Sequence, residues 1–135
     1  MDYQYHMEVL GRNVATSTVL SMVGNEVKAM YFESLRRVEN GDFKLLDILH
    51  HLSSGIKAFS TEKCYSGCDE MRQACGGAGF LLSSGVADWW GDLAPYPTFE
   101  GVNTVMFQQS SRLLFKSMKK VKKGKKPIEL FEYLG

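Results

Sequence analysis

The sequence predicts an all-α protein, a short up-down helical bundle, from three observations. Apolar residues recur at helical spacing in three long stretches. Glycine and proline cluster mainly between these stretches, where turns are needed. No segment has the pattern of a convincing strand. With 135 residues and no internal repeat, the chain is expected to form a single domain over residues 1–135.

The first stretch, from about Tyr3 to Val38, is expected to form one helix. Its apolar residues are dense, and Gly11 and Gly24 interrupt it without turn-forming residues around them. The sequence Asn-Gly-Asp at 40–42 marks a break, and Asp42 is expected to cap the helix that follows.

The second stretch runs from Phe43 to Cys75 and is amphipathic. Its first apolar residues are spaced 4, 3, 4 and 3 apart: Leu45, Leu49, Leu52, Ile56 and Phe59. A one-residue slip in this rhythm at 59–63 leaves open whether one helix or two nearly collinear helices form. Gly76 and Gly77 are expected to end the helix.

The three cysteines lie within the second stretch, at spacings of four and seven. Cys64, Cys68 and Cys75 therefore share about one helical face. No histidine lies nearby in the sequence to complete a metal site, and an odd number of cysteines does not suggest a disulfide framework. We expect small thiols buried in a helix interface.

Residues 78–97 are expected to form a long irregular loop before the last helix. Five of these residues are glycine or proline, and no period holds through them. A compact domain rarely tolerates such a loop unless it binds something. Thr98 is expected to cap the third helix, which continues to about Lys123, and Gly124 and Pro127 then end it.

Glu100 stands between Phe99 and Gly101, where this third helix is expected to begin. The positive end of a helix dipole favours the charged carboxylate, whereas apolar neighbours disfavour it by desolvation. A carboxylate under both influences is a candidate general base. The alternative is an ordinary carboxylate at a helix start, and by itself the segment "CGGAGF" is equally consistent with a helix cap and turn.

Together, the segments "RQACGGAGF" and "PTFEGVNTVMFQQSSRLLFKS" resemble the C-terminal helical region of the acyl-CoA oxidases, relatives of the flavin-dependent acyl-CoA dehydrogenases. In that family "ACGGHGY" ends one helix, "TFEGENTVM" opens the next after a loop, and an arginine follows. The matching positions here are 74–80, 98–106 and Arg112. Weaker likenesses at both ends extend the resemblance over nearly the whole chain.

The resemblance implies a catalytic role for Glu100. As the base of the family's Phe-Glu-Gly, it would remove the α-proton of a fatty acyl-CoA while FAD takes a hydride from the β-carbon. The products in β-oxidation would be a trans-2-enoyl-CoA and, after reoxidation by O2, hydrogen peroxide. The expected compartment is the peroxisome or the mitochondrion, although the chain shows no targeting signal.

The resemblance also assigns candidate FAD-binding residues. Gly76, Gly77 and Gly79 would lie against a flavin, often one held mainly by the partner subunit. Glycine suits this role because exposed backbone amides can approach ligand oxygens without a Cβ in the way. Asn103 and Thr104 lie where the family approaches the flavin.

Three replacements depart from the family pattern: Ala78 replaces its histidine, Phe80 its tyrosine and Val102 its acidic residue. The family's flavin-binding domains are also missing from this sequence, so we expect the chain alone to bind FAD weakly or not at all. Two hypotheses remain open. The chain is a fragment or split subunit of an acyl-CoA oxidase, or it is a non-catalytic structural subunit of a larger assembly, mitochondrial for example.

The remaining features have simple explanations beside the functional ones. The adjacent Trp89 and Trp90 either line a cavity or anchor a loop on the core. His50 and His51 point to different helix faces and do not suggest a metal site. Seven of the eleven residues at 116–126 are lysines, in a chain of formal net charge +1. This lysine-rich tail either meets phosphates, acidic lipid or RNA, or is a solvated helix end, and the lack of interleaved aromatic residues disfavours nucleic acid. The expected partners are other subunits in a homo- or hetero-oligomer and an acyl-CoA substrate, with no transmembrane segment.

Overall fold

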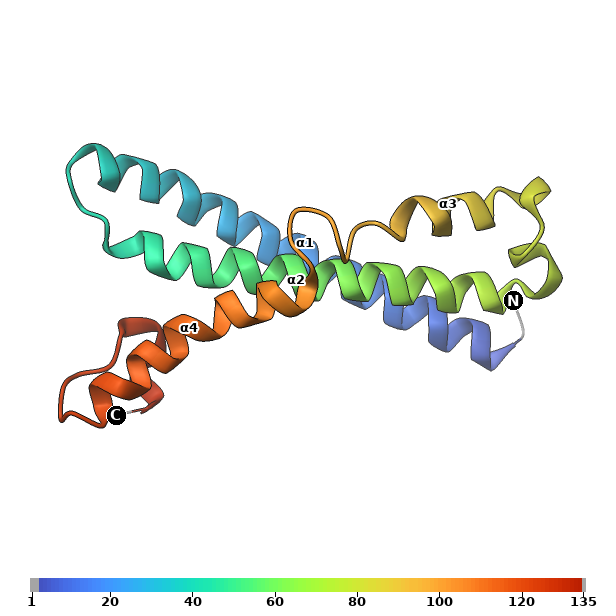
Figure 1. Ribbon diagram of the computed structural model, residues 1–135. Coiled ribbons are helices and arrows are strands. Elements are labelled where there is room, and N and C mark those ends of the chain that lie inside the picture. Colours follow the sequence, from blue (N-terminus) through green and yellow to red (C-terminus); the bar gives the residue numbers. More distant parts are fainter. Residues whose placement is uncertain (1–2, 135) are drawn as a thin grey trace.

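The computed structural model describes residues 3–134, which form only helices, turns and short connections (Figure 1). The four α-helices are α1 (Gln4–Glu39), α2 (Lys44–Ala74), α3 (Val86–Leu93) and α4 (Asn103–Val121). Three short 3-10 helices accompany them: η1 (Gly76–Gly79), η2 (Leu82–Ser84) and η3 (Glu129–Leu134). The prediction of an all-α fold is confirmed.

Helix α2 is the central element, and the other α-helices pack along it (Figure 1). Helix α1 runs antiparallel to α2 and crosses it near the middle of both helices. Helix α4 lies along the N-terminal half of α2, and α3 lies along the C-terminal half. The chain is therefore an elongated bundle in which the two ends of α2 have different neighbours.

Polar contacts join α1 and α2 at the end of the pair where the start of α1 lies beside the end of α2. His6 Nε2 lies 2.6 Å from the carbonyl oxygen of Ala74, and Arg12 donates to Glu70 at 2.8 Å. At the other end, the turn uses Gly41 with φ of 78°, a conformation that glycine adopts without strain. The expectation that Asp42 caps α2 is wrong: its carboxylate accepts from the amide of Lys44, but the N-cap position is Phe43, one residue later, because α2 begins only at Lys44.

The buried core is small and partly polar. The buried apolar residues are Val9, Ala58, Leu113 and Phe131, and the buried polar ones are Ser34, Ser54, Asn103 and Ser117. Small residues bring α4 close to α2: a Cβ on Gly55 would lie 2.9 Å from the hydroxyl of Ser110. Phe131 of η3 also packs against α2, where its ring and the ring of His51 meet edge to face.

Helix α2 is one continuous helix, so the shift in apolar rhythm at 59–63 does not divide it. Helix α1 likewise continues through both of its interior glycines. Cys75 follows the last residue of α2, and Gly76 then takes a φ of 58°, which confirms that the glycine pair ends this helix.

The expectation of a long irregular loop is wrong. Residues 78–97 contain the end of η1, all of η2 and the eight-residue helix α3. Gly85, with φ of 74°, provides the left-handed turn that starts α3, and Pro95 and Pro97 follow after its end. The dense glycine and proline content therefore marks the borders of a short helix.

Two further expectations are corrected. Thr98 does not cap the last helix, because its hydroxyl donates to the Pro95 carbonyl and α4 begins only at Asn103. The cysteines are not uniformly buried: Cys64 and Cys75 are exposed, and Cys68 is half-buried. The C-terminal part of α2 packs against α1, α3 and η1, and these elements leave Cys64 and Cys75 uncovered. Desolvation is the main cause that raises the pKa of Cys68 above its usual range.

Candidate functional site

Glu100 lies in a tight turn immediately before α4. Its φ is 56°, and it is the one non-glycine residue with positive φ among residues 3–134. The next residue, Gly101, has a φ of 108°, and a Cβ there would lie 2.6 Å from the Met106 methyl group. Non-glycine residues in this region are strained and cluster at functional sites. The surrounding structure must therefore impose the left-handed backbone conformation of Glu100.

Asn103 fixes this turn to α2. Its Oδ1 accepts from Lys57 at 3.0 Å and from Thr61 at 3.1 Å. Its Nδ2 donates to the Ala58 carbonyl at 3.1 Å and to the Glu62 carboxylate at 3.3 Å. A side-chain amide has two acceptor sites and two donors, so the capacity of Asn103 is fully used. Asn103 is buried at 7% exposure, and its side chain acts within the fold.

Lys57 is the second residue that anchors the turn. Its half-buried ammonium group donates to the backbone carbonyl of Gly101 at 2.8 Å, in addition to its bond with Asn103. A charged donor strengthens both bonds relative to neutral pairs. Sequence reasoning did not identify Lys57, because a lone lysine in a helix carries no motif. Its one signal is its place next to Ile56, at the edge of the apolar face of α2.

The surroundings of Glu100 differ from the expectation. The carboxylate precedes the first turn of α4 and is exposed to solvent, and Phe99 is 45% exposed beside it. Phe99 instead packs edge-on against Tyr96, with ring centroids 5.0 Å apart. Residues 3–134 therefore present Glu100 on a rigid turn but do not enclose it.

The three glycines of the second candidate cluster are not equivalent. Gly76 takes the positive φ that turns the chain at the end of α2. Gly79 is buried, and a Cβ there would lie 1.9 Å from the Arg72 carbonyl oxygen. Gly77 has nothing within 4 Å of where a Cβ would stand and an ordinary φ. The fold thus requires glycine at 76 and 79, whereas the space beside Gly77 is open to a ligand.

An open hollow of about 840 Å³ adjoins this glycine segment. Its lining is mainly apolar and comes from η1, η2, α3 and the end of α2: Arg72, Gly79, Phe80, Leu81, Leu82, Ala87, Trp90 and Gly91. Trp90 stacks on Tyr65, and the Arg72 guanidinium lies 5.1 Å from the Trp90 ring. These contacts dock α3 on α2, whereas Trp89 is 72% exposed. Trp90 therefore both anchors its segment and lines a cavity.

The two candidate clusters are separated along α2. Lys57 holds the Glu100 turn near the middle of the helix, and Arg72 contacts Gly79 near its C-terminal end. At 1.5 Å per residue, these two positions are about 22 Å apart along the axis. Glu100, Asn103 and Thr104 are close in sequence at the start of α4, whereas η1 with the glycine segment follows the C-terminal end of α2 (Figure 1). Of this first group, Thr104 is exposed in the opening turn of α4.

Other candidate sites give simpler results. Within residues 3–134, no group of three or more His, Cys, Asp or Glu side chains is arranged to hold a metal ion. His51 Nδ1 lies 2.5 Å from the Ser110 carbonyl oxygen, where it joins α2 to α4. None of the described helices is both long and apolar enough to span a membrane.

The described residues form an all-helical domain in which a non-glycine residue with positive φ, Glu100, precedes the last long helix. The family model for the acyl-CoA oxidase C-alpha1 domain matches residues 1–115. The chain therefore belongs to the acyl-CoA oxidase family.

Individual relatives agree with this assignment. Over all 135 residues, the chain is 37% identical to peroxisomal acyl-coenzyme A oxidase 1 of Rattus norvegicus and 35% identical to the Homo sapiens protein of the same name. It covers 20% of the length of each of these relatives.

Two solved structures share the fold. Acyl-CoA oxidase 1 of Arabidopsis thaliana matches 99% of this chain and 20% of its own, with a TM-score of 0.87 and 30% identity. Acyl-CoA oxidase-1 of Caenorhabditis elegans, in complex with FAD and ATP, matches 92% of this chain and 19% of its own. Its TM-score is 0.83, at 31% identity. The expected resemblance to the C-terminal helical domain of these enzymes is confirmed.

Proposed function

We propose that the chain supplies the catalytic base of an FAD-dependent acyl-CoA oxidase of fatty-acid β-oxidation, as a fragment or as one subunit of a split enzyme. The observation that carries this proposal is the conformation of Glu100. The left-handed backbone conformation of Glu100 is costly to the fold, and the hydrogen bonds of half-buried Lys57 and buried Asn103 maintain it. A residue that served only the fold would not need to adopt this conformation.

In the proposed reaction, Glu100 accepts the α-proton of a fatty acyl-CoA on one carboxylate oxygen. Bound FAD would supply the acceptor for the hydride of the β-carbon and the route of its electrons to O2, so the products would be a trans-2-enoyl-CoA and hydrogen peroxide. Gly101 shapes the turn that presents Glu100, because only glycine adopts its φ of 108° freely and the Met106 methyl group fills the space that a Cβ would take. Water must be excluded by elements other than residues 3–134, since Glu100 is exposed in this chain.

We propose that the glycine segment contacts one edge of FAD. The open space at Gly77 and the hollow beside Gly79 would receive it, and Thr104 remains a candidate contact near Glu100. Lys57 and Arg72, which contact the two clusters, are about 22 Å apart along α2, and this separation supports contacts with different parts of the cofactor, or with flavins of two subunits. Asn103 contributes by holding the turn, since its amide has no free donor. We expect the chain alone to bind FAD weakly, which titration followed by flavin fluorescence would measure.

The proposed setting is a peroxisomal oxidase assembled from several subunits. The names of the relatives support the compartment and the substrate, because they describe peroxisomal acyl-coenzyme A oxidases, and the exposed apolar surface of this chain supports assembly with other subunits. A mitochondrial location remains the alternative compartment. Fractionation of cells that express the tagged full-length protein would distinguish the two compartments.

The test is Glu100→Gln in an assembled enzyme that contains this chain. Gln preserves the size and hydrogen-bonding shape of the side chain but cannot take up the proton. Turnover, measured as enoyl-CoA and peroxide formation, should fall on the order of 10²–10⁴-fold while acyl-CoA binding persists. Asp92→Asn, which removes an exposed carboxylate of α3, is the matched control and should leave turnover unchanged.

The second candidate is a non-catalytic structural subunit derived from the same fold. It is favoured by Phe80, which is 78% exposed where the family has a tyrosine, and by the large exposed apolar surface. Equal turnover of the Glu100→Gln and wild-type assemblies would favour this candidate. Glu100 would then be a carboxylate near a helix start with no role in the chemistry.

A further inference from the structure

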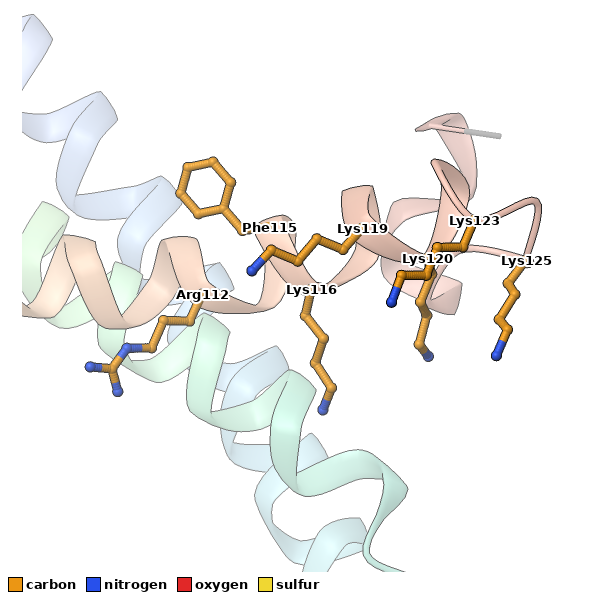
Figure 2. A pocket seen from close by; sticks show the side chains of 7 residues that line it. All are labelled: Arg112, Phe115, Lys116, Lys119, Lys120, Lys123 and Lys125. Carbon is orange, nitrogen blue, oxygen red and sulfur yellow. The ribbon is translucent and has the colours of Figure 1, made fainter.

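The C-terminal half of α4 and the turn after it carry a basic groove that the proposed oxidase chemistry does not use. The groove has a volume of about 690 Å³. We call its lining residues the basic groove: Arg112, Phe115, Lys116, Lys119, Lys120, Lys123 and Lys125 (Figure 2). It is thus lined by six cationic side chains and one aromatic ring, with no carboxylate among them.

Most of these cations form no ion pair within residues 3–134, and two carboxylates, Asp47 and Glu129, line an adjoining hollow with Lys116 and Lys120. Lys116 pairs with Asp47, while Lys119, Lys120, Lys123 and Lys125 form no ion pair with any residue in 3–134. Figure 2 shows Lys116, Lys120 and Lys125 extended toward the same side of α4. Close like charges raise the local potential and attract anions.

This potential determines what can cover the groove. Burying unpaired ammonium groups against neutral protein surface is expensive, so this face favours solvent or a negatively charged partner. A solvated helix end needs no more than a few cations near the C-terminus to complement the helix dipole. The six cations around one groove exceed that need, which points to a polyanionic partner.

The side chains indicate an extended anionic surface in preference to a single small phosphate ligand. A discrete ligand site fixes a few polar groups in advance by hydrogen bonds. Lys119, Lys120, Lys123 and Lys125 make no side-chain hydrogen bonds within residues 3–134, and most of them are exposed. Flexible ammonium groups instead follow a surface of many spaced charges, such as lipid headgroups.

Phe115 adds the apolar component of such a contact. It is 56% exposed at one edge of the groove (Figure 2). An exposed aromatic ring beside a lysine-rich face is typical of helices that lie in the membrane interface. A single ring among these cations also lacks the succession of stacking platforms that single-stranded nucleic acid uses. We propose that the basic groove binds the anionic surface of a phospholipid membrane, with Phe115 inserted among the headgroups.

Vesicle sedimentation with the full 135-residue chain tests this proposal. The chain should bind vesicles of phosphatidylserine and phosphatidylcholine in a ratio of about 3:7, and pure phosphatidylcholine vesicles far more weakly. Each lysine near an anionic surface contributes about fivefold to partitioning, so Lys119→Gln/Lys123→Gln should reduce binding by about 25-fold. Phe115→Ser should reduce it further. Salt at about 1 M should abolish the binding, because the Debye length falls to about 3 Å.

The matched control is Lys28→Gln/Lys63→Gln, which removes the same charge from exposed positions of α1 and α2. It should bind phosphatidylserine vesicles nearly as well as the wild type. Circular dichroism verifies that both double variants keep their helicity. Equal losses in the two double variants would attribute binding to net charge and overturn the proposal.

Two other ligands complete the experiment. Sodium tripolyphosphate tests for a soluble phosphate site, and a single-stranded RNA homopolymer tests for nucleic acid. Saturable binding of either one, together with no preference for phosphatidylserine vesicles, overturns the proposal. Failure of the groove variants to weaken vesicle binding does the same. Neither result depends on acyl-CoA turnover, so the outcome is independent of the role proposed for Glu100.

Discussion

The ammonium group of Lys57 donates a hydrogen bond to the backbone carbonyl of Gly101, 2.8 Å away, across 44 residues of sequence. This contact joins the middle of α2 to the turn that presents Glu100. Because the same ammonium group also binds Asn103, one side chain restrains both ends of the short segment between Glu100 and α4. The position of the candidate base is therefore set from α2.

Replacing Lys57 should destabilise the protein. Lys57→Met retains most of the aliphatic chain but leaves the Gly101 carbonyl without this donor in a half-buried place. The free energy of unfolding should fall by about 1–3 kcal/mol, as measured by urea denaturation. Lys28→Met, at an exposed position of α1, is the control and should stay within about 0.5 kcal/mol of the wild type. A similar loss in both variants would contradict an anchoring role.

Glu100→Gly should stabilise the chain while removing the proposed base. Glycine adopts the observed φ of 56° without the steric cost that a side chain incurs there, although it loses more entropy on folding. The net gain should be up to about 1 kcal/mol in thermal or urea unfolding. Glu100→Gln keeps the side chain and should show no such gain. A loss of stability in the glycine variant would show that the Glu100 side chain supports the fold.

The glycines of η1 should respond differently to the same substitution. Gly79→Ala forces a methyl group against the Arg72 carbonyl oxygen, a backbone atom that cannot move alone. We expect a loss of about 1–3 kcal/mol in unfolding free energy. Gly77→Ala meets nothing within 4 Å and should change stability by less than about 0.5 kcal/mol. Similar losses at both positions would mean that η1 is packed more tightly than the structure indicates.

The three cysteines should be alkylated at different rates. Burial raises the pKa of Cys68, so at pH 8 a smaller fraction of this thiol is ionised than its usual pKa would give. The half-buried sulfur is also less accessible to the alkylating reagent. Mass spectrometry after brief iodoacetamide treatment should show Cys64 and Cys75 modified before Cys68. In about 8 M urea the three rates should converge, because the folded environment is lost. Equal rates under native conditions would argue against the partial burial of Cys68.

The chain should associate in solution. Only four apolar residues are buried among those described, while many large apolar side chains are exposed along α1 and α4. Examples are Met22, Phe32, Leu35 and Phe107. An exposed apolar surface of this kind usually meets a partner. Sedimentation velocity at about 50 µM should detect species larger than a monomer, and a cooperative monomer that binds no apolar dye would contradict this expectation.

The three long helices were predictable because their apolar residues recur over many turns and Gly76 ends α2 in a recognisable way. Helix α3 was not, since eight residues between glycines and prolines carry too few turns to show a period. The candidate base was found by resemblance, but its place outside α4 was not. A positive φ at a non-glycine residue is imposed by tertiary contacts, here from Lys57 and Asn103, which the local sequence does not report.

The central place of α2 has a consequence for how the molecule opens. Helices α1, α3 and α4 pack chiefly on α2 and little on one another, so each can detach without the loss of the other two. Thermal fluctuations should therefore release α3 as one cooperative unit and α4 with η3 as another. The amide protons of α2 should exchange slowest with deuterium. A partner that covers α3 or α4 would slow amide exchange in that helix first. The pattern of slowed amides would therefore reveal which of the two helices the partner contacts.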